Sequence, residues 1–248
     1  MATCACEINA CVLCENRLYT GLSKEQVCQI RERLIREMYE PHEVLFREGD
    51  EAAFLLSLRS GQVKLTTSMP DGRQQILRIA VAGQLLGIET FKGQRYPFTA
   101  ETLTDVVACK ISHNDLRQVL EMNPAVSLRV IESLSQQLDQ AESLIRDLGL
   151  KTSLEKVSGF LLSLIPQRGK PDAELPLRLS RREIAEMLGL TEETVSRIMA
   201  DFARRKIIES GKGYIRILDR KWLGETAGVS NDSTGARNVV PLTAPRAV

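Results

Sequence analysis

The chain has 248 residues and a formal net charge of +1, with 43% hydrophobic and 26% charged residues. This length suits two domains with separate cores, and the small net charge excludes blanket nucleic-acid affinity while allowing a local basic face. No apolar run is long enough to cross a bilayer, and the first residues lack the pattern of a signal peptide, so we expect a cytoplasmic protein without membrane contact.

Four cysteines lie close together at the start of the chain, at Cys4, Cys6, Cys11 and Cys14. Thiols stay reduced in the cytoplasm, so such a group indicates metal ligands or reactive thiols and not structural disulfides. Residues 1–21 are therefore expected to be an irregular, cysteine-rich segment.

Residues 22–123 are expected to form a sensory domain. It begins with a helix opened by Leu22-Ser23, because apolar residues recur at helical spacing. These residues are Val27, Ile30, Leu34 and Met38. From Pro41 to about Ile111, short and partly alternating runs separated by turn residues predict an antiparallel β-roll, a cupin-like jelly roll. The runs are Val44–Phe46, Phe54–Leu58, Val63–Thr67, Gln75–Ile79 and Val106–Ile111.

A helix of about 27 residues is expected after Asn123-Pro124, over residues 124–150. Its apolar residues repeat with the alternating three- and four-residue steps of a coiled coil, which predicts pairing with a second copy of the chain. The alternative is that this stripe packs onto the protein's own roll. The stripe consists of Ile131, Leu134, Leu138, Ala141, Ile145 and Leu148.

Residues 151–224 are expected to form a winged helix-turn-helix domain. Ser180 and Glu183 have the spacing of a capping box that starts one helix, and Gly189 stands where its C-terminal turn needs a left-handed residue. Thr191 is placed to cap the next helix. The whole fold class is therefore α+β.

The second helix of this motif has two distinct faces. Its apolar side, expected to be buried, is formed by Val195, Ile198, Met199 and Phe202. Its polar side suits a major groove. Arg can donate two hydrogen bonds to guanine, a carboxylate can accept a hydrogen bond from the cytosine amino group, and Ser can contact base or phosphate. That side carries Glu193, Ser196, Arg197 and Arg204.

Two short apolar runs, Ile207-Ile208 and Tyr214–Ile217, predict a two-stranded wing whose Lys212 meets phosphate. Residues 225–248 are rich in Gly, Ser, Thr and Pro without periodicity, and they are expected to be a disordered tail.

These motifs together resemble the CRP/FNR family of transcription regulators. The resemblance covers nearly all of the ordered chain and is carried by SGQVKLTTSMPDGRQQILRIAVAGQLLG in the roll and LSRREIAEMLGLTEETVSRIMADFARRKII near the C-terminus. EETVSR is similar to the recognition helix of the FNR branch. This implies that Glu193, Ser196 and Arg197 read palindromic TTGAT-N4-ATCAA-like promoter sites as part of a homodimer, with RNA polymerase as partner.

The resemblance also implies a [4Fe–4S] cluster that senses oxygen, NO or redox state, held by three N-terminal cysteines and one on a strand of the roll. Cys109, in DVVACKIS, matches that distant position. Thiolates suit iron, and such a cluster needs four ligands. The spacing here, C-x-C-x4-C-x2-C, departs from the usual C-x2-C-x5-C of the branch. The expected ligands are Cys6, Cys11, Cys14 and Cys109, with Cys4 as the alternative.

Ala141 stands near the place where such oxygen sensors often carry an acidic residue that weakens the apo dimer. A dimer that changes only its DNA affinity therefore fits as well as a monomer–dimer switch. Whether the protein activates or represses transcription is left open, although the resemblance favours an activator.

Other sensors are compatible with the same fold. Zinc could be held by the four N-terminal cysteines alone, and any close pair could act as a thiol switch. A haem would have only His42 and His113 as imidazole ligands. Cyclic-nucleotide binders carry a Gly-Glu-Leu motif and an Arg-Ser pair where this chain has Gly83-Gln84-Leu85 and Arg95-Tyr96. No phosphate loop or nucleophile elbow is present, so no enzyme is expected.

Overall fold

The computed structural model describes residue 23 and residues 29–90, 95–165, 175–211 and 213–228. The chain divides into two compact units, which span residues 1–67 with 79–137 and residues 68–78 with 138–248. Within the described residues, no helix is long and apolar enough to cross a membrane.

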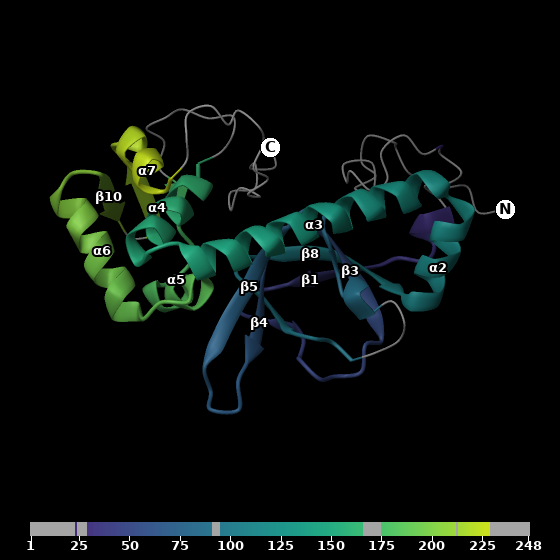
Figure 1. Cartoon of the computed structure of the whole chain (residues 1–248). Helices are drawn as coiled ribbons and strands as arrows, with labels where there is room; N and C mark the ends of the chain where they lie inside the picture. Colours follow the sequence, from purple (N-terminus) through teal and green to yellow (C-terminus); the bar gives the residue numbers. More distant parts are fainter. Residues whose placement is uncertain (1–22, 24–28, 91–94, 166–174, 212, 229–248) are drawn as a thin grey trace. The chain divides into compact units, whose positions relative to one another are not determined.

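Two four-stranded antiparallel sheets build the roll, and Figure 1 shows their strands. The first has the order β1 (Ile35–Tyr39), β8 (Val106–Ser112), β3 (Phe54–Ser60) and β6 (Leu85–Leu86). The second has the order β2 (Val44–Phe46), β7 (Thr99–Thr102), β4 (Gln62–Ser68) and β5 (Gln74–Val81). The expected roll is confirmed, with β1, β6 and β7 as strands that the sequence pattern did not indicate.

The roll has two apolar clusters, one on each face of its first sheet. Between the sheets, Leu56 and Leu58 of β3 meet Val63 and Leu65 of β4. On the outer face, residues of β3 and β8 pack against α2 (His113–Met122) and the beginning of α3 (Pro124–Leu150). This second cluster joins the first sheet to the long helix and contains Leu55, Ile111, Leu116, Val126 and Val130.

The helix expected near the N-terminus ends earlier than predicted. Helical residues end at Arg31, so Leu34 lies outside the helix and Met38 belongs to β1. Met38 pairs with Val107 of β8 in an antiparallel register. The edge of β8 offers backbone hydrogen bonds to this segment, and that non-local pairing overrides the apparent helical spacing. The expected start of the helix, including Val27, lies outside the described residues.

The long helix α3 has the predicted bounds. Its buried residues are Val126 and Val130, neither of which belongs to the predicted stripe. Ile131 is 60% exposed and Ile145 71% exposed. Leu134, Leu138 and Ala141 are also exposed, while Leu148 is half-buried. The stripe is therefore open to solvent along most of its length in this single chain.

The second unit is a winged helix-turn-helix. Its elements are α4 (Ser153–Ser163), β9 (Leu175–Pro176), α5 (Arg181–Leu188), α6 (Glu192–Arg204), β10 (Ile208–Gly211), β11 (Tyr214–Ile217) and α7 (Arg220–Thr226). The helix α7 crosses the boundary expected at residue 224, because Asp219 caps it and Leu223 and Ala227 are buried. The predicted tail is thus wrong at its first residues, and residues 229–248 lie outside the described part of the chain.

Candidate nucleic-acid interface

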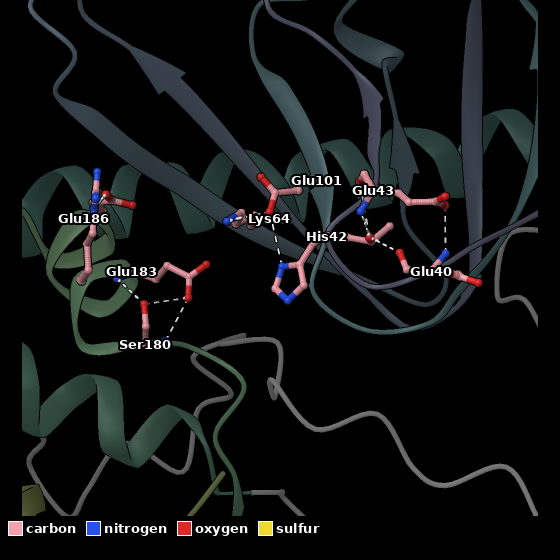
Figure 2. Close-up of polar contacts among 10 residues, drawn as sticks. Glu40, His42, Glu43, Lys64, Glu101, Ser180, Glu183 and Glu186 are labelled. Carbon is pink, nitrogen blue, oxygen red and sulfur yellow. Dashed lines mark hydrogen bonds and ion pairs between the residues drawn. The ribbon is translucent and has the colours of Figure 1, made fainter. Parts of the chain in front are cut away.

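The first helix of the motif, α5, starts at a complete capping box, drawn in Figure 2. The backbone N–H of Ser180 donates to the Glu183 carboxylate at 2.9 Å, and the Glu183 N–H donates to Ser180 Oγ at 3.2 Å. These bonds satisfy N–H groups that the first turn leaves without helical partners, and they fix where the helix begins.

The turn between α5 and α6 depends on Gly189. Its φ of 61° lies in the left-handed region, and a Cβ added there would come within 3.2 Å of Leu148 Cδ2. Both the backbone conformation and the close side chain favour glycine. Thr191 follows this turn. Its hydroxyl accepts a hydrogen bond from the Thr194 N–H at 3.2 Å and caps α6.

The two faces of α6 agree with the expected pattern, with one correction. Val195, Met199 and Phe202 are buried. Ile198 is only partly buried, because it borders a surface hollow at the edge of the helix. Phe202 meets Trp222 of α7 edge to face at 5.3 Å between ring centroids. Aromatic packing behind α6 therefore orients its opposite face toward solvent.

The exposed face of α6 carries the predicted reading residues. Glu193, Ser196 and Arg197 are all exposed. Among the residues that the structure describes, no ion pair engages Glu193 or Arg197. Their polar groups are therefore available to an external partner such as a base edge. Arg204 lies further along the same row, with its side chain 79% exposed.

Arg204 is not available in the same way, because Asp201 binds its guanidinium. The same carboxylate lies 3.6 Å from the Arg205 guanidinium. These ion pairs were not predicted from the sequence, although spacings of three and four residues on a helix indicate such pairs. Asp201, Arg197 and Arg204 line a hollow of about 480 Å³ together with Leu154, Ile198 and Ala200.

The wing is a three-stranded antiparallel sheet in which β10 pairs with β11 and β11 pairs with β9. Arg181, at the start of α5, donates to Ser210 Oγ of β10 at 3.2 Å and ties the wing to the helical motif. Burial lowers the pKa of the Arg181 guanidinium below its usual value. Lys212, predicted to meet phosphate, lies outside the described residues.

Of the predicted sensor ligands, only Cys109 lies among the described residues. It is 8% exposed on β8, opposite Arg36 of β1 and Ser57 of β3. Cys4, Cys6, Cys11 and Cys14 lie outside the part of the chain that the structure describes. Within that part, no group of three or more His, Cys, Asp or Glu side chains could hold a metal ion.

The side of β8 that carries Cys109 can be assigned from its neighbours. Residues two apart on a strand share a face, so Cys109 shares its face with Ile111. Ile111 belongs to the outer cluster, which also contains the almost fully buried Ile30. Ile30 is in the helical turn that follows the N-terminal segment in the chain. Ile30 and Cys109 therefore lie on the same face of the sheet.

The residues considered for a nucleotide form contacts within the roll. The Tyr96 ring is 3% exposed and stacks on Phe46 at 3.9 Å between centroids. Its hydroxyl donates to the Phe54 carbonyl at 2.7 Å, and Arg95 donates to the Gly49 carbonyl at 2.6 Å. Tyr96 is therefore a core residue of the roll.

The two imidazoles considered for haem lie in different settings. His42 has a left-handed φ of 69° in the turn before β2, and its Nδ1 lies 3.6 Å from the Glu101 carboxylate, which Lys64 also contacts (Figure 2). His113, at the start of α2, lies with its Nε2 3.1 Å from Thr90 Oγ1. Each histidine therefore has a polar neighbour of its own within the roll.

Comparisons with known proteins agree with this architecture. Residues 36–123 match the cyclic nucleotide-binding domain and residues 155–226 match the Crp-like helix-turn-helix domain. The chain is 32% identical over 212 residues to the fumarate and nitrate reduction regulatory protein of Vibrio cholerae, which covers 84% of each chain. It is 34% identical to the transcriptional activatory protein AadR of Rhodopseudomonas palustris, over 77% of this chain and 80% of that one.

Among solved structures, FixK2 from Bradyrhizobium japonicum superposes with a TM-score of 0.70 and 27% identity, over 78% of this chain and 96% of that chain. The two domain matches, the relatives and the capped helix-turn-helix with its exposed polar row all lead to one assignment. The chain belongs to the CRP/FNR family of DNA-binding transcription regulators.

Proposed function

We propose that this protein is an oxygen-, NO- or redox-responsive regulator that binds palindromic TTGAT-N4-ATCAA-like promoter sites as a homodimer and acts through RNA polymerase. The observation that carries the proposal is the exposed row of Glu193, Ser196 and Arg197 on a helix fixed by caps at its start and by aromatic packing behind it. A preorganised helix face with these groups has the chemistry needed for direct reading of bases in a major groove.

We assign the sensor to a [4Fe–4S] cluster held by Cys6, Cys11, Cys14 and Cys109, with Cys4 as the alternative. Two observations support the fit: Cys109 is nearly buried on β8, and Ile30, which follows the N-terminal cysteine-rich segment in the chain, packs on the same face of the sheet. The donor set consists of soft thiolates, which match iron. When bound, the cluster would supply a centre that O₂ or NO can attack.

The protein's own residues would couple that segment to α3. Ile30 packs in one cluster with Val126 and Val130 of α3. Arg33 donates to the Asp115 carboxylate of α2 at 3.2 Å, so the same stretch of chain is also attached by an ion pair. A change in the N-terminal segment would therefore act on the packing at the base of the long helix.

Zinc and thiol chemistry are the rival sensors. Neither requires Cys109, since four thiolates at the N-terminus suffice for zinc and a close pair suffices for a thiol switch. The contact that Ile30 makes on the Cys109 face of the sheet favours the cluster.

Cyclic-nucleotide sensing is the alternative that the matched domain suggests. Two contacts of the roll argue against it, because the buried Tyr96 ring fills core space and the exposed Arg95 guanidinium donates to the Gly49 carbonyl. A nucleotide phosphate would have to displace that hydrogen bond, and the Gly83-Gln84-Leu85 stretch lacks the carboxylate of the ribose-binding motif.

A TTGAT-N4-ATCAA duplex provides the direct test of the proposed function. Protein isolated without air should retard this duplex at concentrations that leave a scrambled duplex of equal length free. Exposure to air should release the specific complex. Equal affinity for the two duplexes would contradict the proposed sequence preference.

The proposed dimer gives a separate prediction. Replacing the exposed Leu138 by Asp should weaken self-association on the order of a hundredfold, because each copy would bury an unpaired carboxylate in the interface. Sedimentation equilibrium measures the change. Gln136→Asp adds the same charge to the exposed flank of α3 and should leave the dimer intact. A Leu138→Asp protein that remains fully dimeric would show that the stripe is not the interface.

A further inference from the structure

Asp201 forms ion pairs with two arginines at the C-terminal end of α6. Its two carboxylate oxygens are divided between them: Oδ1 binds Arg204, and Oδ2 lies 3.6 Å from Arg205. Arg205 is also held from the other side, with its guanidinium 4.5 Å from the centre of the Trp222 ring. One carboxylate therefore pairs with two cations at the end of α6.

Helical periodicity places Asp201 and its two arginines beside the exposed row formed by Glu193, Ser196 and Arg197. Arg197, Ala200 and Arg204 follow one another at spacings of three and four residues, so they share a face of α6. Asp201 lies at the edge of that face, where it lines the hollow with Arg197 and Arg204. Within the described residues, Arg197 has no ion-pair partner, whereas Arg204 is bound by Asp201 although its side chain is 79% exposed.

This difference has a direct consequence for DNA binding. An arginine that is free to contact phosphates adds affinity for DNA of every sequence. Each phosphate that it neutralises makes the DNA affinity fall more steeply with salt concentration. A carboxylate beside it supplies a competing intramolecular partner and repels the nearest phosphates. The cost falls more heavily on incorrect sequences, because they depend on phosphate contacts for more of their affinity.

We propose that Asp201 is a positioning residue that sets specificity: by binding Arg204 and Arg205 it suppresses sequence-independent affinity, so that recognition depends on Arg197 and its neighbours. This inference rests on the proposed reading of DNA by α6. It adds a residue that contacts no base and acts through the two arginines next to it.

Asp201→Asn tests the proposal, because it removes the charge and keeps the size of the side chain. Affinity for a scrambled duplex should rise by about threefold to tenfold, and the slope of log affinity against log salt should steepen by about one unit. The preference for the TTGAT-N4-ATCAA duplex over the scrambled one should fall. Fluorescence anisotropy over a range of salt concentrations, with protein isolated without air, measures all three quantities.

Two further variants separate this effect from a general change in charge or structure. Glu225→Gln removes the same charge from α7, where Glu225 lies 3.9 Å from Lys221, and it should change neither the salt slope nor the preference. Adding Arg204→Gln to Asp201→Asn should abolish most of the gain, because the gain acts through Arg204. A merely structural role for Asp201 would lower both affinities and the melting temperature together.

The proposal is overturned if Asp201→Asn leaves the scrambled-duplex affinity and the salt slope unchanged, or lowers both affinities. It is also overturned if Glu225→Gln reproduces the effect. A wild-type protein that does not prefer the TTGAT-N4-ATCAA duplex would instead contradict the proposed promoter sequence. The response of the scrambled duplex to Asp201→Asn would remain measurable in that case, so the two failures can be told apart.

Discussion

Arg197→Ala is expected to weaken binding to a TTGAT-N4-ATCAA duplex by about tenfold to a hundredfold, which corresponds to about 1–3 kcal/mol for a bidentate contact to a base pair. Arg197 is exposed at the middle of the reading row and has no ion-pair partner among the described residues, so its alanine variant loses a DNA contact without disturbing the domain. Gel retardation of both duplexes measures the change.

Arg197→Lys is the matched control for this prediction. Lysine keeps the positive charge but lacks the planar guanidinium that binds two acceptors of one base in a bidentate contact. Binding to a scrambled duplex should therefore stay near the wild-type value, while binding to the specific duplex should fall. If the lysine variant kept the full sequence preference, Arg197 would serve as a phosphate contact and not as a base reader.

Cys109→Ala is expected to abolish both the iron–sulfur chromophore and the response of DNA binding to air. Protein isolated without air should be brown, with absorbance near 400 nm that air bleaches, whereas the variant should contain little iron or sulfide, because a [4Fe–4S] cluster needs four ligands. Absorbance spectra and iron and sulfide analysis measure the loss. Circular dichroism checks that the strand tolerates the small cavity left by the buried thiol.

Cys28→Ala is the matched control, since Cys28 lies outside the expected ligand set of Cys6, Cys11, Cys14 and Cys109 with Cys4 as the alternative. It should retain iron and air sensitivity. Colourless wild-type protein with stoichiometric zinc would identify a zinc site instead. A Cys109→Ala protein with normal iron content and normal air sensitivity would show that Cys109 is not a ligand and that the N-terminal cysteines alone form the sensor.

Local features of the chain were predicted correctly from its sequence. The capping box of Ser180 and Glu183 and the left-handed Gly189 were predicted correctly. So were the bounds of α3. These are local features, fixed by hydrogen bonds and backbone preferences within a few residues, and a short window of sequence contains all the information they need. The buried face of α6 was also predicted, apart from the partial exposure of Ile198.

Features that depend on distant partners were not predictable in the same way. Met38 fits a helical stripe and yet belongs to β1, because β8 supplies the neighbouring edge. The burial of Tyr96 depends on Phe46 and Phe54, which come from other strands. The ion pairs of Asp201 are local, and spacings of three and four residues on one helix indicate its candidate partners, but the folded side chains decide that it pairs with Arg204 and Arg205 and not with Arg197.

The sequence by itself determined the family, the order of roll, long helix and winged helix-turn-helix, and the polar row on α6 that we propose reads DNA. Only the tertiary structure decided which face of the first sheet carries Cys109 and that most of the stripe on α3 is exposed. It also decided that, among the described residues, a carboxylate binds Arg204 while no ion pair engages Arg197. The reason is physical: periodicity specifies which residues share a face, but only the packed chain determines what that face meets.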